Sequence, residues 1–582
     1  MKNYSIYKDD LPKNTVIKIK QIFNQLEFDI SELFIPNKIP ISLRVHLKDK
    51  INIGANGKGT SVENATASAY AEFIERIQNS LVINFLDNIS FLKKDILETE
   101  SILKNYNKSI QKYFNKYINL FIKNNILSKE EITFLEFYNL KEKKIYNLPY
   151  SVIKILDGSN GMSAGNTFEE ALVQGISEIC ERYSMKKILS ENISIPNINP
   201  SYYMEYANIR KIIDYYNEIG YQIIVKDASL GGVLPCVCTV VLNKKKNIMN
   251  VLFASHTNLI VAIERTLTEF AQGLDIEKYY IEPASCMPII SNNKFMYISQ
   301  ENIFLSVVHR QIAFEINDIL KKQFLENNDF SSSLEDSFLF DNSIKTNKEL
   351  LSFMVDKVSN ISSEIYVRNN AFLGFPTVKI FIPNISETYR LNTEMIKNIV
   401  NSENWTRATA DYSNQKLYNI NTLCKYAEFS LFFLEKQVTG LNTVFDVPFE
   451  YVAILCSIVL KNYKKFKMYF DILIGQNKYE ELYTEEQIKI FEIIKMYFEL
   501  LETNDGISQE KIKENLKLNY IEDDVTEAIE IFNNLNFEEI LDIVLKDNRN
   551  YYSSDSSVLK NKLIKQYVDN IPDQSVFEKI LN

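Results

Sequence analysis

Cysteine is scarce in this sequence, and its spacing excludes the usual cysteine-based sites. Only 6 of the 582 residues are cysteines, and Cys236 and Cys238 alone lie close together, as a C-x-C pair. There is no C-x-x-C pair and no C-x-x-x-C-x-x-C motif, whereas tetrahedral zinc sites and iron–sulfur clusters need such spacings. We therefore expect no disulfide framework, and any radical chemistry would need another protein.

Long apolar runs and an excess of basic residues are also missing. No run approaches 18 uncharged apolar residues, and the opening MKNYSIYKDD has no apolar segment, so neither membrane insertion nor export is expected. The formal net charge of −10 argues against direct binding to nucleic acid, because such binding relies on Lys and Arg contacts to phosphates. The sequence favours a cytoplasmic protein.

The standard motifs for phosphate binding and nucleophilic catalysis are absent. The stretch NGKG at Asn56–Gly59 lacks the spacing of a P-loop, because Lys58 is followed by glycine rather than by Ser or Thr. The three histidines lie in unrelated contexts, at His46, His256 and His309. They indicate neither a Ser-His-Asp triad nor a Cys-His pair.

The chain is long enough for at least two domains, and its patterns change along its length. With 46% apolar residues it can bury substantial cores. Strand and helix patterns alternate up to about residue 400, which predicts an α+β domain over 1–400 with mixed β-sheets flanked by helices. Residues 80–146 indicate a mostly helical surface insertion. Residues 401–582 carry successive helix patterns, which predict an all-α domain of helical hairpins.

Three helical segments share one polar plan. They are YAEFIERIQN at 70–79, GISEICERYS at 175–184 and VAIERTLTEFAQG at 261–273. On a helix turning 100° per residue, Glu170, Gln174, Glu178 and Glu181 fall within an arc of about 80°. The same projection groups Ser68, Glu72 and Glu75 on one segment, and Arg265, Glu269 and Gln272 on another, each opposite an apolar face.

An ordinary solvated face is the simplest interpretation of any one such stripe. Like charges one turn apart repel, however, and this repulsion is usually relieved by a Lys four residues away. These stripes contain no Lys although the chain is rich in it. Magnesium prefers carboxylate oxygens, and the planar fork of Arg suits phosphate. The candidate metal ligands are Glu72, Glu75, Glu178, Glu181 and Glu269, and the candidate phosphate-binding residues are Arg182 and Arg265.

Glu170 has a second interpretation of equal weight. Thr167-x-x-Glu170 is a capping box, in which the two side chains satisfy backbone N–H groups at the start of a helix. The small-residue loops NGKG and NGMSAGNT come just before two of the helices, and backbone N–H groups in such loops can bind anions.

At these residues the chain resembles the YcaO family, whose members bind ATP and magnesium through glutamate-rich helices. The likeness rests on four stretches in the family's order: NGKG with ASAYAEFIER, NGMSAGNTFEEALVQGISEICERY, DASLGGVLPC and AIERTLTEFAQG. It covers about the first 400 residues. The helical tail resembles the tetratricopeptide-like domain of a long, stand-alone subgroup, although the characteristic tetratricopeptide residues are missing.

The resemblance assigns roles residue by residue. It implies magnesium ligands at the five glutamates named above and phosphate contacts, important for catalysis, at Arg182 and Arg265. It surrounds the nucleotide with Lys8, Thr15, Ser68, Ser163, Asn166, Glu170 and Gln174. Lys8 and Thr15 come from the short match KDDLPKNT, for which a solvated segment is an equally good interpretation.

The resemblance also implies a reaction: ATP phosphorylates the oxygen of a peptide amide after a nucleophile has added to its carbon. The long subgroup is linked to β-methylthiolation of a small-subunit ribosomal protein, as an accessory to a radical methylthiotransferase. Many members of the family form homodimers. The alternative is an enzyme that forms azolines, amidines or thioamides in a precursor peptide, although the Pro-rich PxPxP end of azoline-forming relatives is replaced here by SVFEKILN. A third hypothesis is a nucleotide-sensing scaffold without catalysis.

Overall fold

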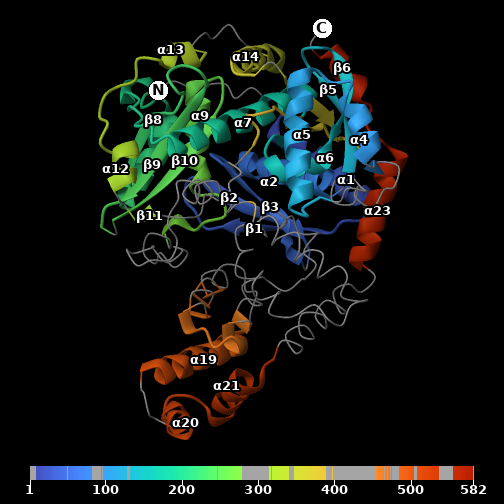
Figure 1. The fold of residues 1–582 in the computed structure, drawn as a ribbon. Coiled ribbons are helices and arrows are strands. Elements are labelled where there is room, and N and C mark those ends of the chain that lie inside the picture. Colours follow the sequence, from blue (N-terminus) through green and yellow to red (C-terminus); the bar gives the residue numbers. More distant parts are fainter. Residues whose placement is uncertain are drawn as a thin grey trace.

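A computed structural model of the chain shows a β-rich upper part and a helical lower part (Figure 1). The structure describes residues 8–48, 50–81, 93–94, 96–127, 132–245, 247–277, 314–315, 318–339, 346–362, 364–387, 396, several short pieces between 454 and 474, 484–503, 508–536 and 555–580. Residues 401–453 of the expected helical domain therefore lie outside the described residues.

The first layer is a three-stranded antiparallel sheet covered by two helices. Its elements are α1 (Pro12–Gln25), β1 (Ile30–Ile35), β2 (Ile41–Leu47), β3 (Lys50–Gly59) and α2 (Val62–Arg76), which continues as a π-helical turn η1 (Ile77–Leu81). Ser61 caps α2 by accepting a hydrogen bond from the backbone N–H of Asn64. Gly57 lets β3 approach α2 closely, because a Cβ atom there would lie 2.1 Å from the carbonyl oxygen of Ala65. This contact fixes the acidic stripe of α2 beside the end of β3.

The second sheet brings together strands that are distant in sequence. Its strand order is β4-β5-β12-β13-β7, with β6 pairing to β5. The strands are β4 (Lys93–Lys94), β5 (Ile132–Asn139), β6 (Lys144–Pro149), β7 (Met162–Ala164), β12 (Tyr366–Asn369) and β13 (Thr377–Phe381). The helices of this part are α4 (Ile96–Leu103), α5 (Lys108–Lys123), α6 (Tyr150–Asp157) and α14 (Asn347–Ser359).

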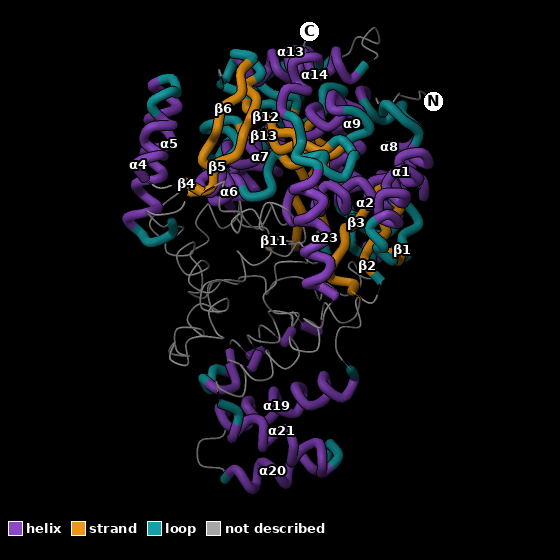
Figure 2. Tube along the Cα trace, turned by 90° about the vertical axis from the view of Figure 1, so that its right-hand side faces the viewer, coloured by secondary structure: helices purple, strands orange, loops and turns teal. Residues whose placement is uncertain are grey.

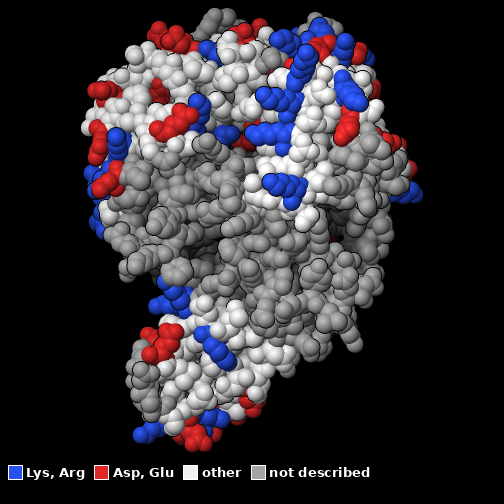
Figure 3. Space-filling view, in the orientation of Figure 1, with Lys and Arg blue, Asp and Glu red and all other residues white. Residues whose placement is uncertain are grey.

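The stretch 80–146 differs from the expected helical surface insertion. Helices α4 and α5 agree with it, and the exposed side of α5 carries the lysines seen as a blue column in Figure 3. Strand β5, however, is buried at all but one of its positions, and β5 pairs with both β6 and β12. The helical prediction is wrong there because the apolar run ITFLEFYN is covered on both faces, which hides the alternation of a half-exposed strand.

The third sheet has the order β11-β10-β9-β8. Its strands are β8 (Gln222–Asp227), β9 (Cys236–Asn243), β10 (Ile248–Ser255) and β11 (Phe314–Glu315). The helices and turns of this part are η3 (Pro200–Tyr202), α8 (Ala207–Glu218), α9 (Leu259–Glu269), α12 (Asp318–Phe324) and α13 (Leu334–Ser337). Every residue of β9 is buried, and Cys236 and Cys238 on it are free thiols.

Helix α7 (Phe168–Ser190) joins the second and third sheets. It contacts β7 and β13 on one side and β9 and β10 on the other (Figures 1 and 2). All pairings between the named strands are antiparallel. The α+β prediction is therefore confirmed, whereas the expected mixed sheets are antiparallel among the described strands. Short connections favour this arrangement, because successive antiparallel strands need only a hairpin.

The helical part has a core of its own. Helices α19 (Glu485–Thr503), α20 (Gln509–Lys517) and α21 (Glu522–Asn534) contact one another, and aromatic side chains such as Phe466, Phe498 and Phe532 pack together in their core. None of the described helices is apolar enough over 18 residues to cross a membrane.

The end of the described chain returns to the β-rich part. Helix α23 (Asp555–Asp569) contributes Tyr567 to the main hydrophobic core, to which strands of all three sheets contribute. The 3-10 helix η4 (Gln574–Lys579) places the ring of Phe577 near the rings of Tyr138 and Phe168. The division at residue 400 assigns this segment to the helical domain. Its apolar side chains are buried instead against the β-rich part, which a helix pattern alone cannot reveal.

Candidate functional site

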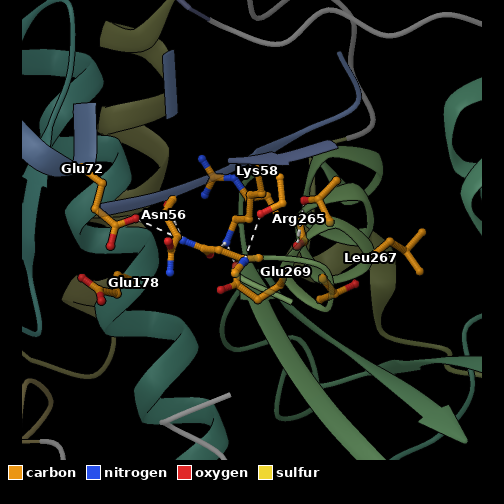
Figure 4. Close-up of polar contacts among 12 residues, drawn as sticks. Asn56, Lys58, Glu72, Glu178, Arg265, Leu267 and Glu269 are labelled. Carbon is orange, nitrogen blue, oxygen red and sulfur yellow. Dashed lines mark hydrogen bonds and ion pairs between the residues drawn. The ribbon is translucent and has the colours of Figure 1, made fainter. Parts of the chain in front are cut away.

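Helices α2, α7 and α9 bring their polar stripes to one place. Figure 4 shows Glu72 and Glu178 on one side and Arg265 and Glu269 on the other, with Lys58 between them. The sequence-based prediction that separate acidic stripes share a site agrees with this arrangement. The apolar faces of the three helices are buried in the surrounding cores, which forces their polar faces together.

A chain of hydrogen bonds links α9 to α2 and β3. Gln272 donates from Nε2 to Oε2 of Glu72 at 3.2 Å and to the carbonyl oxygen of Asn56 at 2.7 Å. Lys58 donates to Oε1 of Gln272 at 2.9 Å and forms an ion pair with Glu269. Both Lys58 and Glu269 are largely buried, so their ion pair is shielded from solvent. Lys58 and Gln272 are thus site residues to which the sequence assigned no ligand role.

The carboxylates of Glu72, Glu75 and Glu178 form the acidic side of the site. Arg182 donates from Nε and Nη2 to Oε1 of Glu178, at 3.2 and 2.9 Å. Arg76 lies between the other two carboxylates, with its Nη2 3.5 Å from Glu72 Oε1 and its Nε 3.8 Å from Glu75 Oε1. Two arginines thus face three glutamates.

The pKa of Glu75 is raised, mainly by burial and also by its two acidic neighbours. Burial raises its pKa well above the ordinary value, and the charges of Glu178 and Glu72 raise it further, although Arg76 acts in the opposite direction. A cation placed near these three carboxylates would be stabilised by their negative charges. This is the electrostatic environment that a divalent cation requires.

Arg265 reaches from α9 toward α7. It donates from Nη1 to the carbonyl oxygen of Ser255 at 3.2 Å and from Nη2 to Oε1 of Gln174 at 2.5 Å. Burial lowers the pKa of Arg265, whereas the nearby charges of Glu181, Glu264 and Glu170 act to raise it. Glu181 therefore lies within electrostatic reach of Arg265, on the same side of the site as Gln174.

The N-terminal end of α7 holds a second polar group. Lys8 donates to Oε1 of Glu170 at 2.9 Å, and the backbone N–H of Asp9 donates to Oε2 at 3.0 Å. Thr15 donates to Oδ1 of Asn166 at 2.8 Å, and Asn166 donates to Glu170 Oε2 at 3.1 Å. The short match at the start of the chain therefore lies beside the other predicted nucleotide residues.

Both interpretations of Glu170 agree with its contacts in part. The hydroxyl of Thr167 accepts a hydrogen bond from the backbone N–H of Glu170 at 3.1 Å, as in a helix cap. The carboxylate of Glu170, however, is directed to Lys8, Asp9 and Asn166. Burial raises its pKa, but the charge of Lys8 and the hydrogen bonds outweigh burial, so the pKa is lowered overall.

Ser68 and Ser163 occupy different environments. Ser68 is half-buried on α2. Ser163 is fully buried on β7 and donates to the carbonyl oxygen of Ala171 at 2.7 Å. Its hydroxyl therefore fastens the loop before α7 to the first turns of that helix.

His256 is a further residue of this site that the sequence pattern does not predict as functional. It lies between β10 and α9, is 4% exposed, and accepts a hydrogen bond at Nδ1 from the backbone N–H of Asn258 at 3.0 Å. Burial lowers its pKa well below the ordinary value, and the charges of Arg265 and Lys8 lower it further. The ring is therefore neutral near pH 7, with its proton on Nε2. Its place in the site is evident only from the fold, where it lies close to the charges of Arg265 and Lys8.

The donor set fits magnesium and a polyphosphate. The acidic side offers carboxylate oxygens, the ligands that magnesium prefers, and its three glutamates outnumber its two arginines. Among the described residues, no group of three or more acidic, His or Cys side chains is gathered as a ready metal cage. The residues Glu72, Glu178 and Glu269 are instead paired with Arg76, Arg182 and Lys58, as expected where phosphate oxygens supply the remaining ligands.

Comparison with known proteins gives a consistent result. The family described as YcaO cyclodehydratase, ATP- and Mg²⁺-binding, matches residues 56–386. A Haemophilus influenzae protein described as uncharacterized is 29% identical over 438 residues, 70% of each chain. The Escherichia coli protein named ribosomal protein S12 methylthiotransferase accessory factor YcaO is 26% identical over 402 residues, and the alignment covers 66% of each chain.

Two solved structures are also similar. A YcaO protein from Methanopyrus kandleri, bound with AMPPCP and Mg²⁺, has a TM-score of 0.43 and 16% identity, covering 66% of this chain and 96% of that one. A heterocyclase in complex with substrate and cofactor has a TM-score of 0.46 and 16% identity, covering 66% of this chain and 54% of that one.

Proposed function

Because the chain belongs to the YcaO family, whose members bind ATP and Mg²⁺, we propose that it uses ATP to activate a peptide amide, as an accessory factor in β-methylthiolation of a small-subunit ribosomal protein. The support for this finer function is the relative named ribosomal protein S12 methylthiotransferase accessory factor, which aligns over 66% of this chain. The sequence lacks cysteine spacings typical of iron–sulfur clusters, which is consistent with a separate radical methylthiotransferase as partner.

The proposed roles follow the two polar groups of the site. Magnesium would be held by Glu72, Glu75, Glu178, Glu181 and Glu269. The nucleotide would be bound by Lys8, Thr15, Ser68, Ser163, Asn166, Glu170 and Gln174, and its phosphates by Arg182 and Arg265. Phosphoryl transfer needs positioned reactants and compensated charge more than a nucleophile on the enzyme. Bound magnesium would supply charge compensation at the phosphates.

In the proposed reaction a nucleophile adds to the amide carbon of the substrate, and the amide oxygen then attacks the γ-phosphorus of ATP. ADP leaves, and phosphate departs when the C–O bond breaks. Arg182 and Arg265 are both largely buried, so their charges act on the phosphates with little screening.

The observation that carries the proposal is geometric: the three carboxylates of Glu72, Glu75 and Glu178 share only two arginines, Arg76 and Arg182. Three partly buried carboxylates that only stabilised the fold would be expected to have one basic partner each. They are instead placed where a magnesium–nucleotide complex would complete the balance.

The substrate is tested in cells that lack this protein. We expect the ribosomal protein, weighed intact by mass spectrometry, to lose its methylthio group, and wild-type protein to restore the group. The Glu178→Ala variant, expressed at the same level, should fail to restore it. An unchanged mass in the deletion strain would reject the ribosomal substrate.

A second candidate is supported by the cyclodehydratase chemistry of the family. It is the formation of an azoline, amidine or thioamide in a precursor peptide. Incubation with ATP, Mg²⁺ and a Cys- or Ser-rich peptide encoded beside the gene should then lower the peptide mass by one water for an azoline. A protein that binds ATP but never releases ADP would favour a nucleotide-sensing scaffold.

A further inference from the structure

A buried ion pair lies directly beneath the acidic side of the site. Lys379 on β13 and Asp157 at the end of α6 are both 0% exposed, and Lys379 Nζ is 3.1 Å from Asp157 Oδ1. The same ammonium donates to the carbonyl oxygens of Gly158 at 3.0 Å and Asn160 at 2.6 Å. Three oxygens thus surround the ammonium, one on the last residue of α6 and two in the turn that follows it.

This turn ends at a residue that contacts a predicted magnesium ligand. The backbone N–H of Gly161 donates to Oε2 of Glu178 at 3.3 Å, and its carbonyl oxygen accepts from the N–H of Ile380 at 2.8 Å. Gly161 has φ +77, and a Cβ atom there would lie 2.5 Å from the carbonyl oxygen of Ile380. Lys379 and Ile380 therefore clamp the turn from neighbouring positions of β13, and the turn holds one oxygen of Glu178. The other oxygen is held by Arg182.

The ion pair is not explained by stability alone. Taking two charges out of water costs several kcal/mol, and apolar residues of similar volume often stabilise a core at least as well. Lys379 is also within electrostatic reach of Glu178, Arg182 and Glu75. A fixed positive charge there lessens the repulsion among the carboxylates.

We propose that Lys379 is a positioning residue for magnesium: it holds the turn 157–161 so that the N–H of Gly161 orients the carboxylate of Glu178. This inference rests on the proposed function, since it assumes that Glu178 binds the metal. Outer partners that orient a metal ligand typically contribute 10–100-fold to metal affinity.

The test uses the full chain with both charges removed, Lys379→Met with Asp157→Leu, so that no unpaired charge is buried. ATP binding is measured by calorimetry at a series of Mg²⁺ concentrations. We expect the half-saturating Mg²⁺ concentration to rise about 10-fold or more, while the residual ATP affinity without Mg²⁺ is unchanged. Adding Glu178→Ala to this variant should weaken Mg²⁺-dependent ATP binding by a smaller factor than the same substitution does in the wild type. The reason is that the two changes act on one interaction.

The matched control is Lys226→Met. Lys226 is also a buried lysine, 1% exposed, and it donates to the carbonyl oxygens of Ile195 at 3.1 Å and Asn327 at 2.9 Å, but it contacts none of the predicted ligands. Its loss is expected to lower thermal stability and to leave the Mg²⁺ requirement unchanged. A general loss of packing would instead affect both variants alike.

Asp157→Asn is a milder second variant that keeps volume and hydrogen bonding. It leaves the ammonium without its counter-charge, so we expect the half-saturating Mg²⁺ concentration to rise about threefold, by charge repulsion of the metal. An unchanged Mg²⁺ requirement in the folded double variant Lys379→Met with Asp157→Leu overturns the role of Lys379 while the proposed function stands. Wild-type protein that binds no ATP with Mg²⁺ overturns both.

Discussion

The two polar groups along α7 use the same residue type in opposite ways. At the N-terminal end, Glu170 is held by Lys8, by the N–H of Asp9 and by Asn166, and its pKa is lowered. Two turns later, Glu178 lies beside Glu75, whose pKa is raised well above the ordinary value. Burial raises the pKa of both carboxylates, but the charge of Lys8 and the hydrogen bonds outweigh burial at Glu170, whereas the charge of Arg76 does not outweigh it at Glu75. The chain itself balances the charge at one end of the site and leaves it unbalanced at the other.

This difference indicates what each half is built to hold. A carboxylate already satisfied by donors can orient neighbouring groups, and Glu170 does so for Lys8 and Asn166. Carboxylates that repel one another store unfavourable energy, which a divalent cation relieves on binding. The nucleotide half around Glu170 should therefore contribute to ATP affinity with or without magnesium. The acidic half around Glu75 and Glu178 should contribute to ATP affinity only when magnesium is present.

The largest expected effect comes from the acidic half. Glu178→Gln and Glu75→Gln should each weaken Mg²⁺-dependent ATP binding more than about 1,000-fold, equal to about 4 kcal/mol. Without ligand, the free energy of unfolding should be unchanged or higher, because a repelling charge is removed. Calorimetry with Mg²⁺ or EDTA and urea unfolding would measure both.

Glu191→Gln is the matched control for these variants, since Glu191 caps the other end of α7 and is exposed, with Lys187 3.1 Å away. It should leave binding unchanged. A loss of stability in Glu178→Gln without a loss of affinity would mean that the carboxylate is structural, and the contrast between the two halves would disappear.

An intermediate effect concerns pH. Burial raises the pKa of Glu264 from 4.5 to about 7, against the opposing charge of Arg265, and its Oε2 has no hydrogen-bond partner among the described residues. Between these values the folded protein binds a proton that the unfolded chain releases. The free energy of unfolding should therefore fall as pH rises from about 4.5 to 7, by at most about 3 kcal/mol.

Glu264→Gln should remove this part of the pH dependence, as measured by urea unfolding without nucleotide at pH 5, 6, 7 and 8. Titration of Glu75 is common to both proteins and cancels in the difference. The exposed Glu510→Gln is the control and should follow the wild type. Parallel curves for Glu264→Gln and the wild type would show that Glu264 does not titrate in this range.

The smallest effect is expected in the nucleotide half. Lys8 is 43% exposed in its pair with Glu170, and such pairs contribute about 1 kcal/mol or less. Lys8→Ala should weaken ATP binding about fivefold, by the same factor with Mg²⁺ and with EDTA, in the same calorimetric assay. The exposed Lys13→Ala on α1 is the control. A loss seen only with Mg²⁺ would contradict the division between the halves.

Much of the site could be predicted because it lies on amphipathic helices. The stripes of Glu72, Glu178 and Glu269 follow from the period of 3.6 residues, and burial of the opposite faces fixes where they point. Lys58 and Lys379 could not be predicted in the same way. One belongs to a strand-ending motif and the other to a buried strand, and strand residues reveal their partners only when the sheets are assembled.

The fold shows the same limit. The sequence predicts a helical insertion where strand β5 lies, because both faces of this strand are covered. The return of α23 depends on apolar side chains that would suit any helical core. Such errors are expected wherever a segment is defined by the partners it packs against rather than by its own period.

By itself, the sequence determined that glutamates and arginines would lie on helical faces without lysine to relieve them, since periodicity is a local property. Only the tertiary structure decided which charges are balanced, since Lys8 and Glu170 are 162 positions apart and Lys379 and Gly158 are 221 apart. The physical reason is that electrostatic energy depends on distance and burial in space. The order of residues along the chain specifies neither until the sheets bring the three helices together.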